Sequence, residues 1–229
     1  MAVELRLPCL CLVADCSVVG PGELPARVAA AVEGGVNLVQ LRAKEMPGGR
    51  LLSLARELKR LSGQRAVLLI NERVDVAVAA FADGVQLGEE ALPIPAASGL
   101  LSPGSLIGRS VHSVDGAVNA TEGGADLLVV GTMFATDSHP GAEPAGPPLV
   151  RDVASRCSLP LIGIGGITPG NLDAVIAAGA SGVAVIRSIL AADDPAAASR
   201  EMLSSLQASW REHRALSDNG VQIETGRPT

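Results

Sequence analysis

Apolar residues in this chain fall into two alternating patterns, one helical and one extended. Four segments share the same order: an Ala/Val-rich stretch with helical spacing, a break at Gly or Asp, and a short β-branched run. The β-branched runs are typical of buried strands, and glycine suits a helix C-terminus because it takes the left-handed conformation without penalty. This order predicts βα units and a parallel sheet. The segments are ARVAAAVEGGVNLVQLR, ERVDVAVAAFADGVQLG, DGAVNATEGGADLLVVG and NLDAVIAAGASGVAVIR.

Counting every apolar run gives eight candidate strands, with helical stretches such as GRLLSLARELKRL between them. Eight evenly distributed strands predict an α/β fold, a single-domain (β/α)₈ TIM barrel over residues 1–215, with an open doubly wound sheet as the alternative. The polar, aperiodic segment 216–229 is expected to be a disordered tail. The candidate strands are 9–14, 37–42, 66–71, 84–88, 105–111, 126–131, 159–165 and 182–187.

Composition narrows the classes of partner. Hydrophobic residues make up 48% of the 229, enough for a sizeable core, although aromatic residues make up only 1%. A net charge of −6 without a basic run argues against a nucleic-acid partner. No apolar stretch reaches the roughly 20 residues needed to span a membrane. We therefore expect a cytoplasmic protein with neither a nucleic-acid nor a membrane partner, and we also expect a homo-oligomer.

The N-terminus and the cysteines carry no special chemistry. In MAVELRLPCLCLVADCS, Glu4 lies where a signal sequence would be basic, and Asp15 precedes Cys16 where a lipoprotein needs a small residue. The four cysteines lack a paired CxxC spacing with histidine support, so a zinc site is not expected. Free, buried thiols are the simpler interpretation.

Polar residues gather where the candidate strands end, and the active site of such a barrel lies at that end. Residues two apart share a strand face, so Gln40 and Arg42 point the same way, as do Ser110 and His112. Arg109 has the opposite parity and is expected to face the helices. Further polar candidates after the strands are Lys44, Asn71, Glu72, Gln86, Glu89, Glu90, Thr132, Arg187 and Ser188.

Cations among these residues indicate an anionic ligand. A net-acidic chain that places Arg42, Lys44 and Arg187 at strand ends is expected to hold an anion there. A Schiff-base aldolase using Lys44 is disfavoured, because Arg42 and Glu45 are close neighbours and the lysine lacks the apolar setting that such catalysis needs.

The stretch GIGGITPGN, residues 163–171, is a candidate phosphate site. Its Gly163, Gly165 and Gly166 let the backbone approach a ligand closely, and Thr168 with Pro169 is expected to be an N-cap and first helical residue. Backbone N–H groups at such a turn bind anions. Loops after the seventh and eighth strands are the usual phosphate site of phosphate-binding barrels.

Several of these motifs together resemble the thiamine phosphate synthase superfamily. They are VQLRAK, INERVDVA, GVQLGEEAL, IGRSVHS, GADLLVVGTMFATDSHPG, IGIGGITPGN and AGASGVAVIRSI, and the match covers roughly residues 8–195. The resemblance implies one of two activities. Thiamine phosphate synthase joins a pyrimidine diphosphate to a thiazole phosphate with magnesium, and thiazole tautomerase aromatises a carboxythiazole phosphate without metal.

Departures from the synthase pattern lead us to prefer the tautomerase branch. That pattern has aspartates where this chain has Glu72 and Ala91, and alanine cannot ligate a hard cation. It also has a lysine in the loop after strand six, where this chain has Ser138-His139-Pro140. A histidine is a poor substitute for a permanent cation against a diphosphate. No cofactor is therefore expected, and magnesium only if the synthase alternative holds.

The tautomerase reading assigns roles within the site. His112 would move the proton, because histidine can accept and return a proton near neutral pH. Gln40, Arg42 and Lys44 would hold the substrate carboxylate. A non-catalytic barrel that binds thiazole or thiamine-related phosphates and regulates a partner is a further alternative. The remaining substrate-binding candidates are Asn71, Gln86, Ser110, Thr136 and His139, and the phosphate-binding candidates are Gly165, Gly166, Ile186 and Arg187.

Overall fold

A computed structural model describes residues 3–136 and 143–219, and its eight parallel strands close into a barrel. The strand order follows the chain, and β1 pairs with β8 to complete the ring. The predicted (β/α)₈ barrel is confirmed, and the open sheet is wrong. The strands are β1 (Cys9–Asp15), β2 (Leu38–Arg42), β3 (Val67–Asn71), β4 (Gly84–Leu87), β5 (Leu106–Val111), β6 (Leu127–Gly131), β7 (Leu161–Ile164) and β8 (Gly182–Val185).

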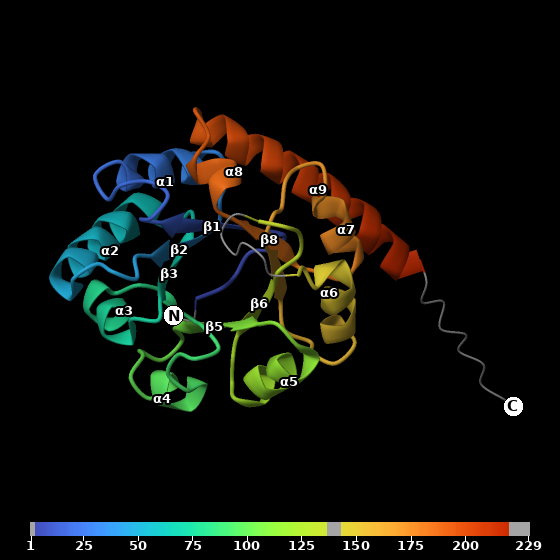
Figure 1. The fold of residues 1–229 in the computed structure, drawn as a ribbon, viewed down its shortest axis with the longest axis horizontal. Coiled ribbons are helices and arrows are strands. Elements are labelled where there is room, and N and C mark those ends of the chain that lie inside the picture. The colour runs from blue at the N-terminus through green and yellow to red at the C-terminus, as the bar shows by residue number, and fades with distance from the viewer. Residues whose placement is uncertain (1–2, 137–142, 220–229) are drawn as a thin grey trace, which may run out of the picture.

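Helices surround the ring of strands, as the view in Figure 1 shows. Their lengths differ: α2 has 15 residues and α4 has five, so α4 covers less of the barrel than α2 does. The helices are α1 (Leu24–Glu33), α2 (Gly48–Ser62), α3 (Val74–Ala80), α4 (Ile94–Ser98), α5 (Val114–Glu122), α6 (Gly146–Ala154), α7 (Leu172–Ala177), α8 (Arg187–Leu190) and α9 (Pro195–Asn219).

Alternate strand positions fill the barrel interior. The inward cluster contains small and branched side chains, among them Cys11, Val13, Leu38, Leu69 and Ala184. Because side chains repeat with period two, the inward face of β2 continues from Leu38 to Gln40, and that of β3 from Leu69 to Asn71. The interior is therefore apolar at the bottom and polar at the C-terminal ends of the strands.

A larger apolar core lies between the barrel and the helices. It includes Leu12 and Val39 from the strands and Val28 and Leu58 from the helices, all fully buried. Burying a side chain of this size contributes about 1.5–3 kcal/mol. The alternation that turns one residue inward turns the next toward this core, which is why the strands read as nearly continuous apolar runs.

All four cysteines are free, in agreement with the sequence interpretation, and Cys9, Cys11 and Cys157 are buried. Burial raises the pKa of the Cys11 thiol to about 12. This thiol therefore stays protonated at neutral pH and acts as a small core side chain.

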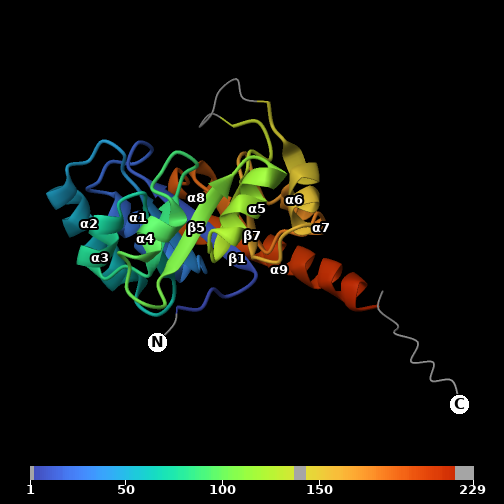
Figure 2. The ribbon, with the colours of Figure 1, turned by 90° about the horizontal axis from the view of Figure 1, so that it is seen from below.

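The long helix α9 packs against α1 and α7, and Figure 2 shows it running past α7. Asp173 of α7 accepts a hydrogen bond from the Ser209 hydroxyl at 2.7 Å, and His213 Nε2 lies 3.0 Å from the same oxygen. The helix ends at Asn219, so residues 216–219 of the expected tail are helical, and 220–229 lie outside the described residues. None of the helices within the described ranges is long and apolar enough to cross a membrane.

Close packing of neighbouring strands predicts opposite effects for two Gly→Ala substitutions. A Cβ at Gly84 would overlap the Leu106 carbonyl oxygen of the adjacent strand, whereas one at Gly49 of α2 meets nothing within 4 Å. We expect Gly84→Ala to destabilise the fold by about 3 kcal/mol or more, and Gly49→Ala to stabilise it by about 0.5–1 kcal/mol. Urea unfolding measures both, and equal effects of the two variants would contradict the packing described.

Candidate functional site

A cavity of about 1030 Å³ opens at the C-terminal ends of the strands. Its position is the one expected from the barrel prediction. Most of the sequence candidates line it: Gln40, Arg42, Lys44, Asn71, Ser110, His112, Thr136, Gly165, Gly166, Ile186 and Arg187.

Of the described substrate-binding candidates, only Gln86 is not part of this lining. Gln86 is only 2% exposed, and its Nε2 donates a hydrogen bond to Ser110 Oγ at 3.1 Å. It therefore lies behind Ser110 and orients that hydroxyl instead of facing the cavity. His139 lies outside the described residues.

An ion pair joins the ends of the first two strands. Strand register places Asp15 beside Arg42, and Arg42 Nη1 contacts Asp15 Oδ2. The backbone N–H and the hydroxyl of Ser17 donate to Asp15 Oδ1 at 2.8 and 2.7 Å. Burial raises the pKa of the Asp15 carboxyl, but the Ser17 hydrogen bonds and the Arg42 charge outweigh it, so the pKa lies below its ordinary value.

The Asp15 pairing changes the expected role of Arg42. The sequence interpretation treats Arg42 as a cation for a substrate anion, but much of its charge is balanced within the protein. Lys44 also lines the cavity, is exposed, and forms no ion pair within the described residues. Lys44 is therefore the cation on this side that a ligand can engage.

Amide side chains connect the next two strands. Gln40 Nε2 donates to Asn71 Oδ1 at 2.9 Å, and Gln40 is 7% exposed. This bond uses one donor and one acceptor. The side-chain oxygen of Gln40 and the side-chain N–H groups of Asn71 have no partner in the described part of the chain. They are available to a ligand.

Carboxylates gather where β3 and β4 end. Glu72, Glu89 and Glu90 all line the cavity. Glu72 has a φ of 60°, and its Oε1 lies 2.7 Å from where a Cβ at Gly88 would be. A bulky residue in this left-handed region is strained. The backbone thus holds the Glu72 carboxylate against the start of the loop that carries Glu89 and Glu90.

Glu89 also holds His112. Its Oε1 accepts a hydrogen bond from the His112 backbone N–H at 3.1 Å, and Oε2 lies 3.3 Å from His112 Nδ1. The His112 side chain is 56% exposed. Arg109 faces outward as its parity predicts, and its Nη2 donates to the Glu89 carbonyl oxygen at 2.8 Å. The loop that carries Glu89 and Glu90 is therefore bound by residues on both faces of β5.

The glycine turn after β7 forms the opposite side of the cavity. Gly165 and Gly166 have φ values of 108° and 61°, which only glycine adopts readily. A Cβ at Gly166 would also overlap the Ala135 carbonyl oxygen. The loop after β6 runs alongside, since the Phe134 N–H donates to the Gly165 carbonyl oxygen at 3.0 Å. Because neither glycine position has room for a side chain, a ligand bound here contacts backbone atoms.

Two expectations about this turn are wrong. The helix α7 begins at Leu172, because Asn171 Oδ1 accepts from the Thr168 N–H at 2.8 Å and its amide donates to the Gly166 carbonyl oxygen at 3.0 Å. Thr168 is therefore part of a hydrogen-bonded loop and not an N-cap. Gly163 faces α7, since an added Cβ would overlap Val175.

Sequence reasoning missed Asp15 and Ser17, which both line the cavity. Asp15 is the last residue of the first apolar strand, so the rule that found Gln40 and Ser110 would also have found it. Ser17 lies past the strand end in a turn. Only its hydrogen bonds to Asp15 bring it into the site.

No group of three or more His, Cys, Asp or Glu side chains in the described residues could form a metal cage. Mg²⁺ is often held by one or two carboxylates together with substrate phosphates. Glu72 and Glu90 offer such oxygens, while Glu89 is engaged with His112. The donor set therefore fits a cation that arrives with a phosphorylated substrate.

Comparison with known proteins places this arrangement in one family. The family described as thiamine monophosphate synthase matches residues 10–189. A thiamine-phosphate synthase of Haloquadratum walsbyi is 43% identical over 195 residues, which are 83% of this chain and 87% of that protein. One from Methanoculleus marisnigri is 44% identical over 191 residues, 82% and 90% of the two chains.

A solved structure agrees with these relatives. Thiamine phosphate pyrophosphorylase from Pyrococcus furiosus superposes with a TM-score of 0.82 at 33% identity, covering 90% of this chain and 99% of that one. These relatives are synthases, which favours the synthase alternative over the tautomerase that the sequence departures led us to prefer. Ala91 is the point of departure from the synthase pattern, and its two neighbours Glu89 and Glu90 line the cavity.

The Asp15–Arg42 pair predicts a specific response to acid. Because the folded-state pKa of Asp15 is depressed, its contribution to stability is present above the unfolded pKa of about 3.9 and is lost as pH falls through the folded value. Asp15→Asn should cost about 1–3 kcal/mol at pH 7 and should lose less stability than wild type on acidification. Urea unfolding at pH 7 and pH 3.5 tests this, and parallel losses in the two proteins would contradict it.

Proposed function

Since this chain belongs to the thiamine monophosphate synthase family, we propose that it joins a pyrimidine diphosphate to a thiazole phosphate and releases diphosphate. One observation supports this above the others. Carboxylates and Lys44 follow β2 to β4, whereas the glycine turn follows β7, four strands from β3 in the closed barrel. The cavity thus offers two anion-binding regions on opposite walls, as a reaction between two phosphorylated substrates requires.

The wall after β2 to β4 suits the diphosphate. A diphosphate carries several negative charges, so it needs cations rather than amides alone. Lys44 supplies one, and Glu72 and Glu90 would hold Mg²⁺ together with the diphosphate oxygens. Bound Mg²⁺ neutralises charge on a leaving diphosphate. The strained backbone of Glu72 supports this role, because its left-handed conformation aims the carboxylate toward the Glu90 loop.

The wall after β7 and β8 suits the thiazole phosphate. Gly165 and Gly166 let a phosphate approach the backbone, and Ile186 and Arg187 line the cavity beside them. The Ser188 hydroxyl donates to the Ile167 carbonyl oxygen at 2.9 Å, which ties the two loops together. A monophosphate matches a small set of backbone N–H donors at a rigid turn.

Thiazole tautomerase is the second candidate, favoured by His112. Its imidazole lies in the cavity wall with Nδ1 close to the Glu89 carboxylate, a pairing that suits a proton carrier. The tautomerase needs neither a diphosphate nor Mg²⁺, so the two candidates differ in metal dependence.

A paired assay separates the two candidates. With pyrimidine diphosphate, thiazole phosphate and Mg²⁺, we expect equimolar thiamine phosphate and diphosphate, detected by chromatography and a coupled diphosphate assay. EDTA should abolish the reaction, because without Mg²⁺ the carboxylates repel the diphosphate and nothing neutralises the charge of the leaving group. Aromatisation of the carboxythiazole phosphate in EDTA, followed by ultraviolet absorbance, together with no thiamine phosphate in Mg²⁺, would overturn the proposal in favour of the tautomerase.

The two lysines of the chain provide a matched pair of variants. Lys44 lines the cavity, whereas Lys59 pairs with Asp83 at 2.6 Å and lies outside the cavity lining. Lys44→Gln should raise KM for the pyrimidine diphosphate about tenfold or more, since a charged hydrogen bond contributes about 1.5–3 kcal/mol. Lys59→Gln should leave KM unchanged per folded molecule. Steady-state kinetics checks both, and an unchanged KM in Lys44→Gln would remove the lysine from the diphosphate site.

A further inference from the structure

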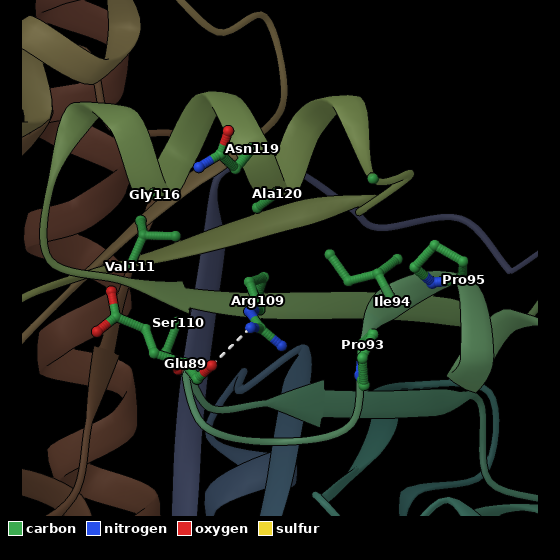
Figure 3. A pocket seen from close by; sticks show the side chains of 11 residues that line it. Glu89, Pro93, Ile94, Pro95, Arg109, Ser110, Val111, Gly116, Asn119 and Ala120 are labelled. Carbon is green, nitrogen blue, oxygen red and sulfur yellow. Dashed lines mark hydrogen bonds between the residues drawn. The ribbon is translucent and has the colours of Figure 1, made fainter.

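A second cavity of about 350 Å³ lies outside the barrel, beside β5. Figure 3 shows its side chains: Arg109 extends from β5 between α5 on one side and the segment around Pro93 and Ile94 on the other. The short helix α4 contributes Ile94 and Pro95 to its lining. A volume of this size is within the range of small-molecule sites.

Arg109 gives this cavity a positively charged group that forms no ion pair within the described residues. Its partners are the carbonyl oxygens of Glu89 at 2.8 Å and Leu92 at 3.5 Å, and no carboxylate in the described residues forms an ion pair with it. A guanidinium group has five N–H donors in a planar fork. Donors therefore remain for a carboxylate, which matches that fork.

The remaining walls are largely apolar. Pro93, Ile94 and Pro95 form one side, and Val111 and Ala120 another. Such walls bury a compact hydrocarbon body, while Arg109 fixes the end that carries the charge. We propose that this cavity is a second ligand site, separate from the barrel mouth, that binds a small organic carboxylate through Arg109.

Glu89 connects this second site to the barrel site. It lines both cavities: its carbonyl oxygen accepts from Arg109, and its carboxylate holds His112. A carboxylate ligand competes for the Arg109 donors that hold the Glu89 carbonyl. Occupancy of the second site therefore shifts the Glu89 loop and the His112 imidazole.

Benzoate is a suitable probe, with benzyl alcohol as its uncharged counterpart. We expect a titration followed by amide NMR to give saturable shifts at Gly116 and Gly123, which line the cavity. We also expect a smaller shift of the His112 backbone N–H, which donates to Glu89 Oε1. Arg109→Met should weaken benzoate binding about tenfold or more. Arg56→Met is the matched control, because Arg56 also donates to a carbonyl oxygen, that of Ala79 at 3.1 Å, but does not line the cavity.

A second variant guards against a loss of binding through misfolding. Asn119 is exposed on α5 and lines the cavity, so Asn119→Trp should block benzoate without removing Arg109. Shifts confined to Gly165 and Gly166, equal binding of benzyl alcohol, or no saturable shifts would each overturn the proposal. Saturation without a His112 shift would overturn its link to the barrel. The titration needs no substrate, so its outcome is independent of the proposed synthase activity.

Discussion

Pairing of β1 with β8 closes the parallel sheet, and the site depends on this closure. Only a closed ring brings the ends of β2, β3, β5 and β7 around one cavity. The ring closes because its interior positions are small where strands approach most closely: an added Cβ at Gly182 would overlap the Cys9 carbonyl oxygen. The near absence of aromatic residues fits the same constraint, since Cys, Val, Leu and Ala fill the interior.

Charge is divided within the cavity that closure creates. Asp15 balances Arg42, Glu89 engages His112, and Lys44 forms no ion pair within the described residues. Glu72 and Glu90 lie on the same side as Lys44, opposite the glycine turn. The side with Lys44 and the carboxylates suits a diphosphate bound together with its metal ion. The side formed by the backbone of the glycine turn suits a monophosphate. This division favours a two-substrate reaction over the one-substrate isomerisation that His112 alone suggests.

Periodicity predicted the fold and much of the site, because both follow from strand spacing and parity. Every candidate strand corresponds to one of the eight strands of the structure. Residue parity correctly predicted that Gln40 and Ser110 point inward and that Arg109 points outward. Periodicity does not predict loop conformation, so the start of α7 was placed at Pro169 instead of Leu172. The hydrogen bonds of Asn171 extend the loop to that point. The preferred branch rested on single missing residues such as Ala91. Spacing placed Glu89 and Glu90 at the end of the fourth strand, but it could not show which way the side chains in this loop point.

Simultaneous occupancy of the two walls is the central claim, and a binding competition tests it most directly. Binding of the thiazole phosphate is measured by calorimetry, first alone and then with the protein saturated with magnesium diphosphate. Two separate anion regions predict that the thiazole phosphate binds with equal or higher affinity in the saturated protein. Loss of binding in proportion to diphosphate occupancy would show a single anion site and would contradict the account.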